Sequence, residues 1–181
     1  ELERDIREAL HQGQFHLAYQ PKVNIRINQL QGLEALLRWN SPTRGNVSPG
    51  NFIPVAEESG HIIPLGYWVL NEVCLTLRSW QDKGLTLVPV SVNVSARQFQ
   101  QPDFHKRVAE VLRKHSIDPS LIEIELTEGL VMEDIDSAQR ELAQLKKIGL
   151  RISIDDFGTG YSCLSYLRRF PIDVLKIDKS F

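Results

Sequence analysis

Six short apolar runs in this chain have the pattern of buried β-strands, and each carries a polar or charged side chain at or near its C-terminal end. The polar residues are Gln20, Glu34, Asn93, Glu125, the adjacent Asp155 and Asp156, and Lys176 with Asp178. A charge in such a run is costly unless it is paired, hydrated or bound to a metal. Because the same interruption recurs in every run, we interpret these residues as parts of one site where the strands end.

Strand and helix patterns alternate along the chain without a proline-rich or low-complexity linker, which predicts a single domain. Strands are expected at residues 15–25, 30–39, 87–94, 121–126, 150–154 and 174–177. Helices are expected at residues 1–12, from Ile63 to Trp80 with Gly84 beyond the end, after Pro102, at 135–148 with Gly149 as C-cap, and at 162–169. Residues 41–50 contain Pro, Gly and Asn, and they are expected to form a loop.

This alternation of strands and helices favours parallel strands. Polar side chains at strand C-termini form the active site of a (β/α)8 barrel, although an open doubly wound sheet gathers ligands at the same strand ends. A closed barrel needs eight strands and typically about 250 residues, so a barrel would be incomplete here. The chain also does not begin with methionine, which suggests a domain excised from a longer protein.

The composition predicts a packed domain of a reducing, cytoplasmic compartment. Hydrophobic residues make up 42% of the chain and charged residues 24%, with a net charge of −2, so neither a basic DNA-binding groove nor a polybasic membrane patch is indicated. A nucleotide ligand is therefore expected to be bound through metal ions. Cys74 and Cys163 are interpreted as core thiols. The apolar stretches fall short of the roughly 20 residues of a membrane span, so we expect no direct membrane insertion, although the parent protein could be anchored.

Six sequence motifs resemble those of one known family. They are EALLRW at residues 34–39, FIPVAEESG at 52–60, SVNVS at 91–95, ELTE at 125–128, DDFGTGYS at 155–162 and KID at 176–178. In this order, and over essentially the whole chain, they are similar to the EAL domains, a family of cyclic di-GMP phosphodiesterases. The resemblance implies that residues 1–181 form a TIM-like (β/α)8 barrel with about six strands present. It also implies hydrolysis of cyclic di-GMP to linear 5'-pGpG in bacterial second-messenger signalling.

The resemblance further implies two divalent cations, Mg²⁺ or Mn²⁺. The ligands of one ion would be Glu34, Asn93, Glu125 and Asp155, and those of the second ion would be Asp155 and Asp156. These are the hard oxygen donors that both metals take, and two ions about 3.5 to 4 Å apart can promote an in-line phosphoryl displacement. Adjacent aspartates point to opposite faces of a regular strand, so both serve one site only where the strand ends. Phe157 and Gly158 are expected to provide that end.

Other positions take their roles from the same resemblance. Glu34, Lys176 and Asp178 would be catalytic, with the Lys176 ammonium stabilising negative charge on the attacking oxygen or the phosphate. Asp178 would orient Lys176 or a water molecule. Gln20 and Arg38 would contact the substrate, since a guanidinium suits a phosphate.

A regulatory loop and several partners are implied as well. Glu128, Gly158 and Gly160 would belong to a loop that couples dimer contacts to metal occupancy, with the glycines making it deformable. The expected partners are cyclic di-GMP, a second copy in a homodimer, and attached or separate sensor and synthase domains. Family members normally continue beyond the position of Phe181 into two more βα units, so the domain is expected to be C-terminally incomplete.

Each of these residues also has a simpler interpretation. Alone, Glu34 would be a solvated acid on an edge strand, Asn93 a capping amide and Lys176 a surface lysine, while Arg38 could pair with Glu34. A short DFG sequence also occurs in protein kinases, but the other kinase motifs are absent from the sequence. For the whole domain, the alternative to an enzyme is a catalytically silent cyclic di-GMP receptor or protein-interaction module. Family members without activity usually lack the first metal ligands, and each of those positions within residues 1–181 is intact, which favours the enzyme. The resemblance places one further glutamate ligand in the βα units beyond Phe181.

Overall fold

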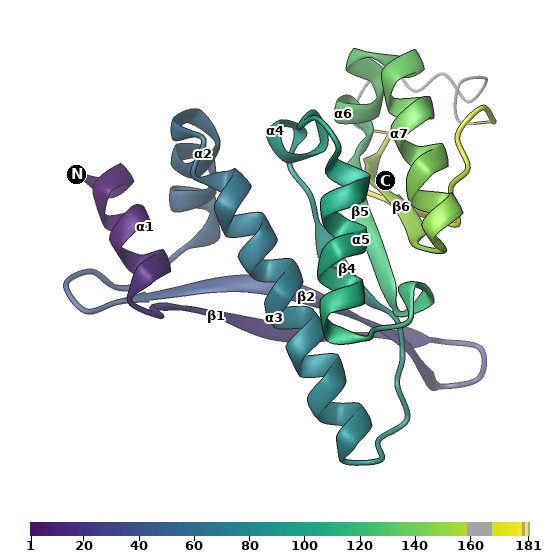
Figure 1. The fold of residues 1–181 in the computed structure, drawn as a ribbon, viewed down its shortest axis with the longest axis horizontal. Helices are drawn as coiled ribbons and strands as arrows, with labels where there is room; N and C mark the ends of the chain where they lie inside the picture. The colour runs from purple at the N-terminus through teal and green to yellow at the C-terminus, as the bar shows by residue number, and fades with distance from the viewer. Residues whose placement is uncertain (159–167, 179, 181) are drawn as a thin grey trace.

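The computed structural model describes residues 1–158, 168–178 and 180. Within this part of the chain the strands form one mixed sheet in the order β1-β2-β4-β5-β6-β7, with β3 paired to β2 (Figure 1). Their bounds are β1 Phe15–Asn24, β2 Gln29–Ser41, β3 Gly45–Val47, β4 Val90–Asn93, β5 Ile122–Thr127, β6 Arg151–Phe157 and β7 Val174–Ile177. The alternation of helices with parallel strands is that of part of a TIM-like barrel.

Helix α1 precedes β1, and the other helices lie in the connections between strands. Their bounds are α1 Leu2–His11, α2 Pro49–Ser59, α3 Ile62–Asp82, α4 Ala96–Phe99, α5 Phe104–His115, α6 Glu128–Glu133 and α7 Ile135–Ile148, with a 3-10 turn at Pro119–Leu121. Figure 1 shows α3, α5 and α7 side by side over one face of the sheet. None of the helices in the described ranges is both long enough and apolar enough to cross a bilayer.

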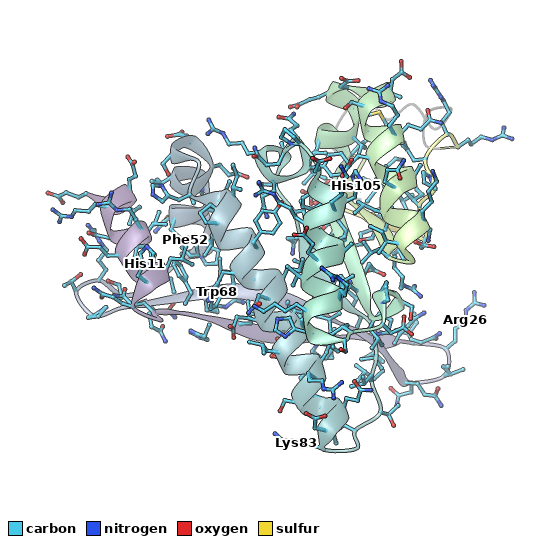
Figure 2. The ribbon with its side chains drawn as sticks, in the orientation of Figure 1. His11, Arg26, Phe52, Trp68, Lys83 and His105 are labelled. Carbon is cyan, nitrogen blue, oxygen red and sulfur yellow. The ribbon has the colours of Figure 1, made fainter. Side chains whose placement is uncertain are left out.

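Strands β2, β4, β5, β6 and β7 are parallel neighbours, as the sequence predicts. The prediction of parallel strands is wrong for β1, which pairs with β2 antiparallel. The reason is the short connection between them, because a parallel pair needs a crossover of a dozen or more residues. The hairpin brings Gln20 opposite Glu34, and its tip extends away from the helices at Arg26 (Figure 2).

The two faces of the sheet differ in polarity because successive strand residues point to opposite sides. Apolar side chains on the outer face, such as Val92, Ile124 and Ile152, are buried in the main core with helical residues such as Leu77 and Leu142. The alternate positions carry polar side chains, of which Ser91, Glu123, Glu125 and Ser153 are buried. The strands therefore have an apolar side that holds the helices and a polar side that builds the site.

A second cluster secures the N-terminal end of the domain. Phe15, Trp39, Phe52 and Trp68 belong to it, with ring centroids 5.5 Å apart for Phe15 and Trp39 and 5.7 Å apart for Phe15 and Phe52. Figure 2 shows Phe52 and Trp68 on the side of the molecule that carries α1 and α2. The cluster fixes α2 and α3 against the hairpin that carries Glu34.

The long helices predicted from the sequence agree with the structure, whereas three short helices of the structure were not predicted. The helix expected from Ile63 to Trp80 is α3, and the one expected at 135–148 is α7, with Gly149 as a left-handed C-cap at φ 104°. The loop predicted at 41–50 is wrong in part, because it contains β3 and the first residues of α2. Helices α2, α4 and α6 were not predicted, and the helix expected at 162–169 falls largely outside the described residues.

Candidate functional site

Three carboxylates from three strands converge on the ammonium group of Lys176. Its Nζ lies 2.6 Å from Asp155 Oδ2, 2.9 Å from Glu125 Oε2 and 3.4 Å from Glu34 Oε2. The strands β2, β5, β6 and β7 supply these side chains from their polar side, and parallel pairing brings their C-terminal ends to one edge. The structure thus brings together four of the residues that the sequence predicts for the site.

Asn93 extends this group to β4. Its Nδ2 donates a hydrogen bond to Glu34 Oε1 at 3.0 Å, and its backbone lies opposite Glu125 in the parallel ladder. A side-chain amide between two carboxylates reduces the repulsion between them because it adds an oxygen ligand without adding negative charge. In the described structure the ion pair of Glu34 is with Lys176, so the alternative in which Glu34 pairs with Arg38 is wrong.

The environment keeps Lys176 charged. Burial disfavours its ammonium form, but the hydrogen bonds to Asp155 and Glu125 outweigh that effect, and the pKa of Lys176 is raised well above its ordinary value. Glu125 is only 1% exposed, and a carboxylate so deeply buried needs charged or hydrogen-bonding partners. Lys176 is one of those partners, so it acts as a cation and a hydrogen-bond donor here.

The backbone of β6 turns at Asp156, the second of the two adjacent aspartates. Its φ of 54° lies in the left-handed region, and the register between β6 and β7 shifts between Ile154 and Phe157. The backbone N–H of Asp156 donates to Asp155 Oδ1 at 2.9 Å. The sequence predicted that Phe157 and Gly158 would end the strand, and this is confirmed, because β6 ends at Phe157. The strand expected at 150–154 extends further than predicted, and the irregularity in its pairing with β7 lies before Phe157.

The predicted substrate-binding residues lie beside the acidic group. Gln20 is paired with Glu34 across the β1–β2 hairpin. Arg38 lies four residues beyond Glu34 on β2, where it donates to the carbonyl oxygen of Leu37 at 2.9 Å. Arg38 and Asn93 both line a cavity of about 230 Å³, whose other walls come from β2, α2, α3 and Gln98 of α4. The residues that line this cavity are mostly apolar, and Glu34, Glu125 and Asp155 are not among them.

Glu128 connects the start of α6 with the end of β6. It is buried, and its Oε2 accepts a hydrogen bond from the backbone N–H of Gly158 at 3.0 Å. Gly158 has a φ of 98°, which a residue with a side chain rarely adopts. Asp178 closes the end of β7, where its N–H donates to the carbonyl of Phe157 at 3.3 Å. Gly160 lies outside the described residues.

A second polar layer, which was not predicted from the sequence, lies on the same side of the sheet. It consists of Lys22, Ser91, Glu123 and Arg151 on β1, β4, β5 and β6. We call it the deeper layer because it lies farther from the edge where the parallel strands end. Lys22 Nζ contacts Ser91 Oγ and lies 3.0 Å from Glu123 Oε1 and 2.5 Å from Glu125 Oε1. Each of these residues lies two or four positions along its strand from a predicted site residue. Because alternate residues of a strand share a face, this spacing is the sequence signal that could have identified the layer.

The charges in this deeper layer stabilise one another. Burial raises the pKa of Glu123, but hydrogen bonds from Ser91, Lys22 and Arg151 outweigh it, so its pKa is lowered. For Lys22, burial acts against the charged form, while hydrogen bonds to Glu125 and Glu123 raise its pKa overall. Both groups are therefore ionised over the neutral range.

The carboxylates suit a hard divalent cation in chemistry and position. Oxygens of Glu34, Glu125 and Asp155 already surround one cationic nitrogen, and Asn93 adds a neutral oxygen donor. Carboxylate and amide oxygens are the preferred ligands of Mg²⁺ and Mn²⁺. Among the described residues no three acidic, imidazole or thiol groups already have metal-binding geometry. A metal would therefore take carboxylate contacts that Lys176 makes in this structure.

Comparisons with known proteins agree with the sequence motifs. A family model described as "EAL domain" matches residues 3–181. The bifunctional diguanylate cyclase/cyclic di-GMP phosphodiesterase MucR of Pseudomonas aeruginosa is 45% identical over 181 residues, which are 100% of this chain and 26% of that protein. The cyclic di-GMP phosphodiesterase PdeR of Escherichia coli is 43% identical over 180 residues, covering 99% of this chain and 27% of its own length.

A solved structure supports the fold comparison. The structure "PaMucR Phosphodiesterase, c-di-GMP complex" superimposes with a TM-score of 0.94 at 45% identity, covering 99% of this chain and 72% of that one. The chain therefore spans about a quarter of the two curated relatives and about three quarters of the solved chain.

Proposed function

Because the chain belongs to the EAL domain family, as its motifs predicted, we propose that it hydrolyses cyclic di-GMP to linear 5'-pGpG with two divalent metal ions. The observation that carries the proposal is the convergence of Glu34, Glu125 and Asp155 on one cation position at the C-terminal edge of the sheet. Relatives named as cyclic di-GMP phosphodiesterases, and a related structure in complex with c-di-GMP, support the choice of substrate.

In this proposal the acidic group holds Mg²⁺ or Mn²⁺. Glu34, Asn93, Glu125 and Asp155 would bind one ion, and Asp155 with Asp156 would bind the other. The metals would supply an activated water and neutralise charge on the phosphate. The left-handed backbone of Asp156 supports the second part of the assignment, because it breaks the alternation that would send adjacent side chains to opposite faces.

The remaining predicted residues would bind and orient the substrate. Lys176, kept cationic by its surroundings, would stabilise negative charge on the phosphate once a metal takes over its carboxylate contacts. Asp178 would orient Lys176 or a water molecule from the end of β7. Gln20 and Arg38 would contact cyclic di-GMP from β1 and β2, with the Arg38 guanidinium at a phosphate.

Regulation would act through the contact between Glu128 and Gly158. The buried Glu128 carboxylate holds the backbone just beyond Asp155 and Asp156, so a movement of α6 would be transmitted to the metal ligands. In a homodimer, contacts near α6 would then influence metal occupancy. The larger size of the relatives is the basis for proposing that residues 1–181 are one domain of a multidomain protein with sensor or synthase domains.

The test compares turnover with binding in the full-length protein. Hydrolysis of cyclic di-GMP with Mg²⁺ or Mn²⁺ is measured for wild type, Glu34→Ala and the control Asp82→Ala, while calorimetry records binding of the same ligand. Asp82 is an exposed acid at the end of α3, and its pair with Arg78 is of the kind that contributes little. We expect linear product from wild type and Asp82→Ala, and a loss of turnover in Glu34→Ala.

The two functional alternatives give different results in this experiment. Tight binding of cyclic di-GMP by wild type without linear product would refute the enzyme and favour a receptor. Full turnover by Glu34→Ala would refute the assignment of the acidic group as the metal site.

A further inference from the structure

Lys22 uses its whole hydrogen-bonding capacity inside the protein. An ammonium group has three N–H donors, and in the described structure those of Lys22 face Ser91 Oγ, Glu123 Oε1 at 3.0 Å and Glu125 Oε1 at 2.5 Å. These acceptors lie on β4 and β5, so the Lys22 side chain extends from β1 across the polar face of the sheet. With all three donors occupied, Lys22 is not available to bind substrate in this arrangement.

The two oxygens of Glu125 have different cationic partners. Oε1 pairs with Lys22 at 2.5 Å, and Oε2 pairs with Lys176 at 2.9 Å. Lys176 also contacts Glu34 and Asp155, so its contacts are those that a metal would take. Lys22 contacts neither of these acids in the described structure. The pair between Lys22 and Oε1 can therefore persist while Oε2 binds a metal.

The position of Lys22 is itself fixed by the deeper polar layer. Glu123 accepts a hydrogen bond from Ser91 Oγ at 2.7 Å through Oε1, and from Arg151 Nε at 3.3 Å through Oε2. Glu123 is 5% exposed, which leaves it little room to move. Lys22 is therefore held by a buried acid that is bonded to two other strands.

We propose that Lys22 is a positioning residue of the metal site, holding Oε1 of Glu125 so that Oε2 faces the cation. The inference rests on the proposed function, because it takes Glu125 to be a metal ligand. Residues that hold a metal ligand in place typically change metal affinity by about 10- to 100-fold when they are replaced.

The direction of the effect separates positioning from charge. Removing the positive charge of Lys22 would, by electrostatics alone, strengthen the binding of a cation to the nearby carboxylates. Loss of positioning would instead weaken binding, because Glu125 could turn its second oxygen away from the metal. The measured sign of the change in Mn²⁺ affinity therefore decides between the two effects.

The experiment titrates Mn²⁺ into the full-length protein by calorimetry, without substrate, and records the Mn²⁺ electron paramagnetic resonance spectrum. The variants are Lys22→Met and Lys22→Met/Glu123→Gln. The double variant keeps the interior net charge of wild type and guards against misfolding of the single one. The matched control is Lys146→Met, which removes an ion pair with Asp173 at 2.8 Å on the outside of the domain. Circular dichroism establishes that each variant is folded.

We expect the folded double variant to bind Mn²⁺ about 10- to 100-fold more weakly than wild type with an altered resonance spectrum, and Lys146→Met to match wild type. Equal or tighter binding by the double variant would overturn the positioning role. Turnover does not enter the titration, so a wild type that binds Mn²⁺ without cleaving cyclic di-GMP refutes the enzyme while the Lys22 comparison stands. A wild type that binds no Mn²⁺ would overturn both proposals.

Discussion

Gly66 on α3 lies directly against the side chain of Gln98, so its replacement by alanine should destabilise the protein although alanine is the better helix former. A Cβ atom at Gly66 would lie 1.5 Å from Gln98 Nε2 and 2.4 Å from Gln98 Cδ. Gln98 is 4% exposed. Its Oε1 accepts hydrogen bonds from the backbone N–H and the hydroxyl of Ser95, both at 3.1 Å, in the capping box that begins α4 directly beyond β4.

The size of the effect follows from three contributions. Crowding in a packed region costs about 1 to 3 kcal/mol. Loss of the two hydrogen bonds to Gln98 Oε1 adds about 1 to 3 kcal/mol, at about 0.5 to 1.5 kcal/mol for each bond. The higher helix propensity of alanine returns about 1 kcal/mol. Gly66→Ala should therefore lower the free energy of unfolding by about 1 to 5 kcal/mol, since the clash outweighs the propensity.

Denaturant unfolding followed by tryptophan fluorescence measures this change. The control is Gly129→Ala on α6, where no neighbouring heavy atom lies within 4 Å of the added Cβ among the described residues, so stability should be unchanged or raised by up to about 1 kcal/mol. In a Gln98→Ala background, Gly66→Ala should lose its penalty. The reasoning is refuted if Gly66→Ala is as stable as wild type, or if its penalty is the same with and without Gln98.

Two further predictions concern single ionisable groups. Cys74 is fully buried, and burial raises the pKa of its thiol to about 12. Mass spectrometry should therefore find Cys74 unalkylated by iodoacetamide at pH 8 until the protein is unfolded. Rapid labelling of the native protein would contradict this. Burial opposes ionisation of Asp173, but hydrogen bonds from Lys146 and the Ile152 N–H outweigh it and lower its pKa. A lowered folded pKa stabilises the protein above the unfolded value of about 4, and this contribution is lost as the pH falls through the folded pKa. Asp173→Asn should therefore lower the free energy of unfolding by less than about 1 kcal/mol at neutral pH, because the ion pair with Lys146 is partly exposed. The difference in stability between this variant and wild type should shrink in acid. A difference independent of pH would contradict the assignment.

The gathering of the acids could be predicted because it depends on local rules. A strand places alternate residues on one face, and parallel strands bring their C-terminal ends together. These two rules suffice to expect that Glu34, Asn93, Glu125 and Asp155 lie near one another. The turn at Asp156 depends on the register between β6 and β7, which shifts between Ile154 and Phe157. A register shift between two strands depends on both partners, so the sequence of β6 alone did not locate it.

The short helices could not be predicted because their signals are weak or ambiguous. Pro49 and Gly50 were interpreted as loop residues, but they are the first two residues of α2, where a proline loses no helical hydrogen bond. Helix α6 has only six residues, too few for a clear apolar period. Its Glu128 contacts Gly158, 30 residues away in the sequence. Contacts of this kind arise only once the sheet is assembled, so they are not encoded in the local pattern.

Glu125 shows why a polar side of a sheet can be stable while it remains ready to bind a cation. Its Oε1 is paired with Lys22, which also contacts Ser91 and Glu123. Its Oε2 is paired with Lys176, which also contacts Glu34 and Asp155 at the edge of the sheet. Removing one partner of a buried ion pair typically costs about 3 to 5 kcal/mol, because the other charge is left uncompensated. A divalent cation that displaces Lys176 would leave none of these carboxylates uncompensated, since it replaces one cation by another beside them. The inner lysine therefore provides the stability, and the outer lysine occupies the position where exchange would take place.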